Sequence, residues 1–249
     1  CDGYIDGSLY SFETGSYLNI STDEMAIGSG YWLRFEEEDE CTFSGVPIDN
    51  ITVSLNEGWN LISGISSTIV VESIIDPSGI IVPGTIYGFG LGYTLVDELE
   101  PGKGYWIRAN GDGIITIQSG SRKGNAQEFI DRSKEANTLV FTNAAGSVSQ
   151  LNFGVRVPER EKISYTLPPL PPAGAFDVRF GEDSRIVDET GEILIQNNEW
   201  PLIIEIHHPP STIHHRSDWY LVDELNGREY ALNESGTIEI TDPVERLTL

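Results

Sequence analysis

The first half of this 249-residue sequence contains an internal repeat, which constrains the fold more strongly than any single motif. Residues 7–35 match residues 84–109 with small deletions. The aligned aromatic residues are Tyr10 with Tyr87, Phe12 with Phe89, Tyr31 with Tyr105 and Trp32 with Trp106. The match predicts two copies of one structural unit, covering about 7–45 and 84–120.

Both copies alternate apolar and polar residues and are broken by glycine, a pattern typical of half-buried antiparallel strands. From residue 136 to residue 249, short alternating segments are separated by turn residues at the spacing of a β-sandwich. The sequence therefore predicts an all-β fold. Tandem antiparallel modules with an internal repeat are expected in residues 1–120, a linker in 121–135 and a β-sandwich in 136–249.

Three shorter motifs have structural interpretations. GFGLG (88–92) aligns with SFETG in the other copy, so we expect a hairpin turn and not a phosphate-binding loop, which has to open a helix. The Asn226–Gly227 pair favours a two-residue type I′ hairpin. LPPLPPAGAF (167–176) predicts a rigid polyproline II crossover between strands, with docking into an aromatic groove as the alternative.

The composition argues against several partners. A formal net charge of −24 and a pI near 4.3 oppose binding to nucleic acids or anionic membranes, which requires basic patches. No apolar run reaches the length needed to span a bilayer, so membrane insertion is not expected. A strongly acidic surface favours solubility and suits an extracellular location.

Two Tyr-Trp pairs, Tyr31–Trp32 and Tyr105–Trp106, are candidate ligand-binding residues. Because adjacent side chains of a strand face opposite sides, only one ring of each pair can point into a given core. An exposed ring beside acidic groups is typical of sugar-binding surfaces. A role in the core is the favoured alternative, because the pair recurs in both copies. Further candidate rings for sugar binding are Trp59, Trp200 and Trp219.

All four histidines fall within one nine-residue stretch, HHPPSTIHH. His207 and His208 end a predicted strand, and His214 and His215 begin the next, so a hairpin would place the two pairs opposite each other. One imidazole from each pair, together with Asp218, would suit Zn²⁺, Ni²⁺ or Cu²⁺. The alternative is a polar loop that is rich in histidine, and no cofactor is expected.

The two cysteines, Cys1 and Cys41, lack the paired spacings of zinc or redox motifs. A disulfide between them would close a loop of about 40 residues and add about 4 kcal/mol of stability on the chain-entropy model. The sequence leaves open whether Cys1 is bridged to Cys41, lipidated or free.

Several motifs carry a resemblance to a known class of proteins. GWNLISG (58–64), the segment 74–94 and LEPGKGYWIRANGDGIITI (99–117) resemble the GWN/GYW β-modules found near the C-terminal ends of large secreted bacterial surface proteins. YTLPPLPPAGAFDVRF (165–180) resembles the sandwich that often follows such modules. Proteins with this arrangement are similar to type IX secretion substrates of the Bacteroidetes and Ignavibacteria. The resemblance implies the architecture and a cell-surface location, but no activity.

No GxSxG or HExxH motif is present, and an enzyme is not expected. The sequence predicts a non-catalytic extracellular module with a structural or adhesive role, as the stalk, spacer or assembly unit of a cell-surface protein. Its expected partners are extracellular or cell-surface proteins, including copies of itself, because an edge strand can pair with a second chain. The alternative is a carbohydrate-binding module that uses exposed Tyr or Trp rings and has glycans as partners.

Overall fold

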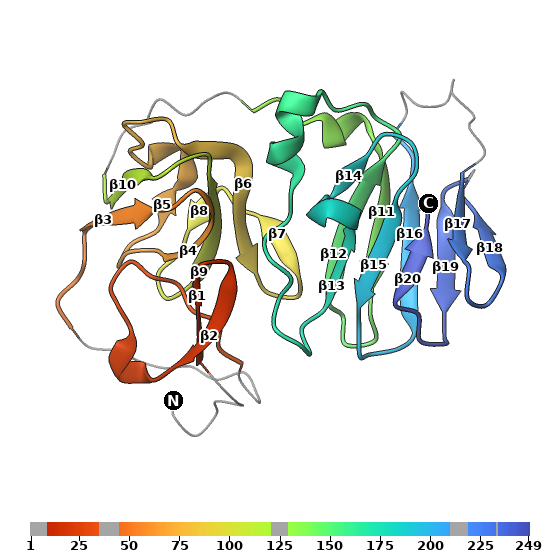
Figure 1. The fold of residues 1–249 in the computed structure, drawn as a ribbon, viewed down its shortest axis with the longest axis horizontal. Coiled ribbons are helices and arrows are strands. Elements are labelled where there is room, and N and C mark those ends of the chain that lie inside the picture. Colours follow the sequence, from red (N-terminus) through yellow and green to blue (C-terminus); the bar gives the residue numbers. More distant parts are fainter. Residues whose placement is uncertain (1–8, 35–44, 121–128, 210–218, 233) are drawn as a thin grey trace. The chain divides into compact units, whose positions relative to one another are not determined.

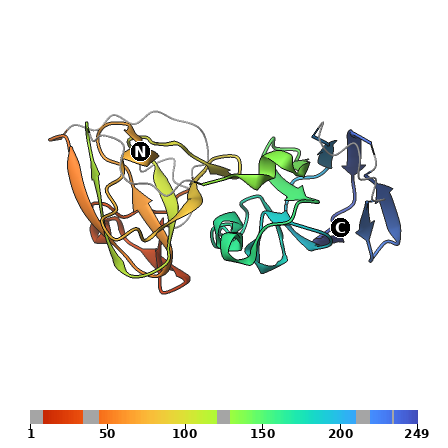
Figure 2. The ribbon, with the colours of Figure 1, turned by 90° about the horizontal axis from the view of Figure 1, so that it is seen from above.

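The computed structural model describes residues 9–34, 45–120, 129–209, 219–232 and 234–249. Strands make up 47% of the structure and helical segments 9%, so the predicted all-β fold is confirmed. The helical segments are short 3₁₀ helices that lie between strands, as Figure 1 and Figure 2 show from two directions. Among the described residues, no helix is long and apolar enough to cross a lipid bilayer.

The chain divides into two compact units. The first unit contains Cys1–Phe89 and Thr94–Glu128, and the second contains Gly90–Tyr93 and Phe129–Leu249. Residues 121–128 of the predicted linker lie outside the described residues. Its remaining part belongs to the second unit, where Arg132–Glu135 forms the 3₁₀ helix η3.

The largest sheet described in the first unit has four strands in the order β4-β9-β6-β7, and two-stranded sheets are formed by β1-β2, β3-β10 and β5-β8. The GFGLG motif connects β6 to its neighbour β7, so the predicted hairpin turn is confirmed. The strands are β1 (Leu9–Glu13), β2 (Ser16–Ile20), β3 (Asn50–Leu55), β4 (Gly58–Ser63), β5 (Ile69–Val70), β6 (Ile81–Phe89), β7 (Tyr93–Leu95), β8 (Glu98–Leu99), β9 (Gly104–Ala109) and β10 (Gly113–Gln118). The 3₁₀ helices are η1 (Thr22–Glu24) and η2 (Val71–Ser73).

Side chains that point alternately inward and outward along the strands form the core of the first unit. In β10, Ile115 and Ile117 are fully buried, whereas the preceding residue, Ile114, is half exposed. The buried side of β10 joins isoleucines and leucines of the neighbouring strands in one apolar cluster. Burial of this cluster is the main driving force for folding of the unit.

The second unit is a sandwich of two five-stranded sheets, with the orders β14-β12-β11-β16-β19 and β13-β15-β20-β17-β18. Figure 1 shows the strands of the two sheets, which overlap in this view. The strands are β11 (Asn137–Thr142), β12 (Val148–Phe153), β13 (Asp177–Phe180), β14 (Ile186–Val187), β15 (Glu192–Gln196), β16 (Leu202–His207), β17 (Tyr220–Asp223), β18 (Arg228–Ala231), β19 (Gly236–Ile240) and β20 (Arg246–Thr248). The 3₁₀ helices besides η3 are η4 (Glu159–Tyr165) and η5 (Gly181–Asp183).

The second sheet of the sandwich has a clear inner and outer face. In β15, Ile193 and Ile195 are buried in the core shared with the first sheet. Leu194 and Gln196 alternate with them and are therefore on the outer face, where they are half-buried. This outer face carries the groove described below.

The hairpin between β17 and β18 differs from the predicted two-residue type I′ turn. Asp223 pairs directly with Arg228, so four residues form the connection. The carboxylate of Asp223 accepts hydrogen bonds from the backbone N–H of Asn226 at 3.1 Å and from its side-chain amide at 2.7 Å. These bonds stabilise the longer turn and leave Leu225 at its tip, 85% exposed.

Candidate functional site

Tyr105 and Trp106, the second Tyr-Trp pair, lie on β9, which is flanked by β4 and β6. Only 2% of Tyr105 and 1% of Trp106 are exposed. Tyr105 packs in the apolar cluster of the first unit, whereas Trp106 contacts aromatic rings. The candidate ligand-binding role of this pair is therefore wrong, and the favoured alternative, a role in the core, is the one observed, because both faces of this central strand are covered.

The tyrosine of each pair makes the same contact in both copies of the repeat. The hydroxyl oxygen of Tyr31 accepts a hydrogen bond from the backbone N–H of Ala26, and that of Tyr105 accepts one from Glu100, both at 2.6 Å. Each tyrosine hydroxyl thereby stabilises a turn that contains a glycine with positive φ. The φ angle is 90° at Gly28 and 76° at Gly102. The tyrosines therefore stabilise equivalent turns in the two copies.

Replacing Tyr105 with phenylalanine should lower the free energy of unfolding of the first unit by about 1–2 kcal/mol, because a partly buried N–H loses its acceptor while the ring remains. Tyr31→Phe is the matched control. Its hydrogen bond is exposed, water can replace it, and the loss should be smaller. Denaturant unfolding monitored by hydrogen exchange of the Ile107 amide measures both values. A larger loss for Tyr31→Phe would contradict this account.

The tryptophans make reciprocal contacts between the two copies. Phe12 of the first copy packs edge-to-face on Trp106 of the second, with ring centroids 4.7 Å apart. Phe89 of the second copy packs in the same way on Trp32 of the first, at 4.4 Å. Each copy thus supplies the phenylalanine that contacts the tryptophan of the other. With their neighbours, these rings form what we call the aromatic cluster: Phe12, Tyr17, Trp32, Trp59, Tyr87, Phe89 and Trp106.

The remaining candidate aromatic residues also pack against neighbouring side chains. Tyr31 and Trp32 are half-buried, as is Trp59, which lies beneath the guanidinium of Arg108 at 5.6 Å. Trp200 and Trp219 are half-buried against the core of the sandwich. All five tryptophans therefore contribute to the packing of their unit: Trp106 is buried and the other four are half-buried, so none is fully exposed.

The histidine cluster is only partly described, because His214, His215 and Asp218 lie outside the described residues. His207 is exposed and its Nε2 lies 3.7 Å from a carboxylate oxygen of Glu205. His208 is half-buried, and its Nδ1 is hydrogen-bonded to the side-chain oxygen of Asn137 at 2.8 Å. In the part of the chain that the structure describes, no three His, Cys, Asp or Glu side chains are grouped to hold a metal. The metal site stays a prediction.

Cys1 and Cys41 also lie outside the described residues. Whether they are bridged stays open.

A groove of about 720 Å³ lies on the outer face of the second sandwich sheet. Its floor crosses the strands, because Arg179, Leu194 and Arg246 are aligned on β13, β15 and β20. Other floor residues are Gln196, Val222 and Thr248. The rim includes Leu170, Asp183, Glu224, Leu225 and Glu245. We call this surface the groove.

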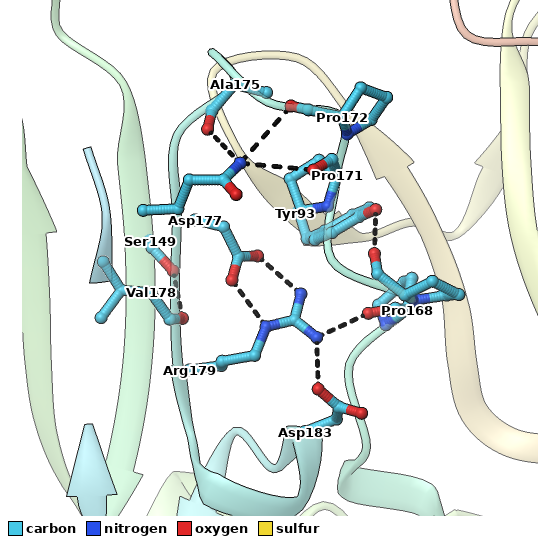
Figure 3. Close-up of polar contacts among 12 residues, drawn as sticks. Tyr93, Ser149, Pro168, Pro171, Pro172, Ala175, Asp177, Val178, Arg179 and Asp183 are labelled. Atoms are coloured by element: carbon cyan, nitrogen blue, oxygen red, sulfur yellow. Dashed lines mark hydrogen bonds and ion pairs between the residues drawn. The ribbon is translucent and has the colours of Figure 1, made fainter. Parts of the chain in front are cut away.

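Arg179 lies at one end of the groove within a buried polar network, shown in Figure 3. Its guanidinium forms a two-pronged ion pair with Asp177 at 2.6 and 2.8 Å, a hydrogen bond to Asp183 at 2.7 Å and one to the carbonyl of Pro168 at 2.9 Å. Burial opposes the charged form, but the bonds to Asp177 and Asp183 outweigh it and raise the pKa of Arg179. Burial also raises the pKa of Asp177, against the effect of Arg179.

Arg179 and Gln196 each bind the proline-rich crossover to the sheet. The side-chain amide of Gln196 donates to the carbonyl of Ala175 at 2.8 Å and, at longer range, to those of Pro171 and Pro172. Arg179 holds the carbonyl of Pro168. These contacts support the interpretation of 167–176 as a rigid crossover, because the carbonyls of a polyproline segment are otherwise left to solvent.

The rim of the groove contains strained backbone. Glu182 and Asp183 are successive non-glycine residues in the left-handed region, with φ of 60° and 55°. Such a conformation costs about 1–2 kcal/mol per residue. The ion pair of Asp183 with Arg179 and the hydrogen bond from the Leu167 N–H to the Asp183 carbonyl offset this cost. Strain of this kind often marks functional surfaces.

The groove was not predicted from the sequence. The alternation in DVRF (177–180) places Asp177 and Arg179 on one face of a strand, and this signal was available. The groove itself depends on strands that are far apart in the sequence.

Comparisons with protein-family models, with curated proteins and with solved structures find no match to this chain.

Proposed function

We propose that this chain is a non-catalytic extracellular module with a structural and adhesive role, serving as a stalk, spacer or assembly unit of a secreted bacterial surface protein. The reciprocal contacts of Phe12 with Trp106 and of Phe89 with Trp32 carry the proposal. In these contacts, aromatic residues of the repeat pack against each other and join the two copies. A module built in this way is suited to a load-bearing or spacing role.

Two further features support the proposal. The net charge of −24 limits nonspecific association outside the cell. In the second unit, the guanidinium of Arg179 donates hydrogen bonds to the carboxylate of Asp177 and to the carbonyl of Pro168 in the crossover. Because both charged groups are already paired, they suit a structural role better than acid–base chemistry. Carbohydrate binding through Tyr or Trp rings is the less favoured alternative, because all five tryptophans are at least half-buried.

Antibodies raised against the purified chain test the proposed location. They should label intact cells of the source organism, and protease treatment of those cells should remove the label. Antibodies against a cytoplasmic protein serve as the control for cell integrity. Labelling that requires permeabilised cells would contradict the proposal.

The adhesive role needs a second test. Deleting the codons of this segment in frame from the parent gene should leave the parent protein exported but reduce attachment of the cells to surfaces or to one another. Unchanged attachment, with the shortened parent present on the surface, would contradict an adhesive role.

A further inference from the structure

We propose that the groove on the outer face of the second sandwich sheet binds an extended peptide segment of a partner protein, one that carries both basic and apolar side chains. The proposal rests on the adhesive part of the proposed function and gives it a specific surface. At about 720 Å³, the groove is within the size range of ligand-binding clefts. It crosses four neighbouring strands, β13, β15, β20 and β17, so an extended segment can lie along it.

The charge of the groove favours a basic ligand. Asp183, Glu224 and Glu245 place three exposed carboxylates on the rim. The two cations are already paired. Arg179 is held by Asp177 and Asp183, and Arg246 lies 2.7 Å from Glu192. The excess of carboxylates attracts Lys or Arg side chains and repels anionic ligands.

Apolar side chains line the same surface. Leu225 at the tip of the β17–β18 turn is 85% exposed, and Leu170 of the crossover is 48% exposed. Leu194 and Val222 are half-buried on the floor between them. Apolar groups grouped in a concavity with a polar rim are typical of protein interaction surfaces. Apolar side chains of a bound peptide would cover these residues and remove them from water.

The lining also favours a peptide over a glycan. None of the described residues that line the groove is aromatic, so no ring is available to stack on a sugar.

The rigid walls of the groove support binding, because the crossover is fixed by Arg179 and Gln196 before any ligand arrives. A preformed groove loses little conformational freedom on binding.

The test titrates the isotope-labelled full chain with four synthetic hexapeptides and follows backbone amide shifts. The peptides alternate lysine with leucine, glutamate with leucine, serine with leucine, and lysine with serine. We expect saturable shifts at Leu194, Val222 and Thr248 with the lysine–leucine peptide. Binding should be about tenfold weaker for the serine–leucine and lysine–serine peptides, and the glutamate–leucine peptide should not bind.

Variants separate the groove from nonspecific attraction to an acidic protein. Glu224→Lys/Glu245→Lys should weaken binding of the lysine–leucine peptide about tenfold or more. The control Glu234→Lys/Glu239→Lys changes the net charge equally at exposed residues outside the groove and should leave binding almost unchanged. Leu225→Ser keeps the charge and alters a residue that is already exposed, and it should weaken binding severalfold.

Several outcomes would overturn the proposal. These are no shifts at the groove with any peptide, equal binding of the glutamate–leucine peptide, or equal weakening by both pairs of lysine substitutions. Shifts at the same amides with a neutral oligosaccharide, and none with peptides, would replace the peptide with a glycan. Because these measurements use the purified chain, their failure is distinguishable from a failure of the cell-labelling experiment.

Discussion

Replacing Trp106 with alanine should lower the free energy of unfolding of the first unit by about 3–5 kcal/mol, the usual cost of truncating a buried tryptophan. The side chain is 1% exposed and contacts Phe12, Tyr17 and Trp59. Its removal leaves a cavity in the middle of the aromatic cluster. A loss of this size is a large fraction of the about 5–15 kcal/mol by which native proteins are stable, so the first unit should open far more often.

Hydrogen exchange of buried amides measures this effect in each unit separately. In Trp106→Ala, protection should fall at Ile107 and Ile115 of the first unit, while Leu139 and Ile204 of the second unit report on the sandwich. Trp32→Ala is the matched comparison, because Trp32 is only half-buried and its removal should cost less. Equal and small losses in the two variants would contradict the central place of Trp106 in the aromatic cluster.

Replacing Arg179 with methionine should lower the free energy of unfolding of the second unit by about 3–5 kcal/mol, because a buried carboxylate is left without its partner. Asp177 is 3% exposed and would lose both hydrogen bonds from the guanidinium. The crossover would also lose its contact with Arg179 at Pro168. Denaturant unfolding followed by exchange of the Leu139 amide gives the loss.

Two further variants identify the cause of that loss. Arg179→Met/Asp177→Leu removes both charges and should recover much of the stability, since an apolar pair can replace a buried ion pair. Arg246→Met breaks the exposed pair with Glu192 and should cost about 1 kcal/mol or less. If the double variant were as unstable as the single one, the loss would come from the crossover contact and not from the stranded carboxylate.

The repeat made much of the first unit predictable, since aligned residues occupy equivalent positions. Tyr31 and Tyr105 hold equivalent turns, and Tyr10 pairs with Trp32 as Tyr87 pairs with Trp106. The alignment could not show which phenylalanine contacts which tryptophan, because that depends on how the two copies pack. For the same reason, the alignment left open an exposed ring in the Tyr105–Trp106 pair, although a role in the core was the favoured alternative. Alternation identifies two faces of a strand but not what covers each face.

In the second unit, alternation predicted the strands of a sandwich but not the surface that they form. Alternation places Leu194 and Gln196 on the same face of a strand but does not show that this face forms a groove. The groove also needs the proline-rich crossover, the turn at Leu225 and the strained rim at Asp183, which are brought together by the fold. The four-residue turn at Leu225 was not predicted, because the prediction was based on the Asn-Gly pair alone. It did not consider that the side chain of Asp223 accepts a hydrogen bond within the turn.

Nuclear Overhauser contacts between the rings of the aromatic cluster show whether the two copies of the repeat interlock. With selectively labelled phenylalanine and tryptophan, we expect cross-peaks between Phe12 and Trp106 and between Phe89 and Trp32, whose ring centroids are 4.7 and 4.4 Å apart. Single substitutions of each phenylalanine assign the peaks. Cross-peaks confined to Phe12 with Trp32 and Phe89 with Trp106, within each copy, would contradict the interlocked repeat.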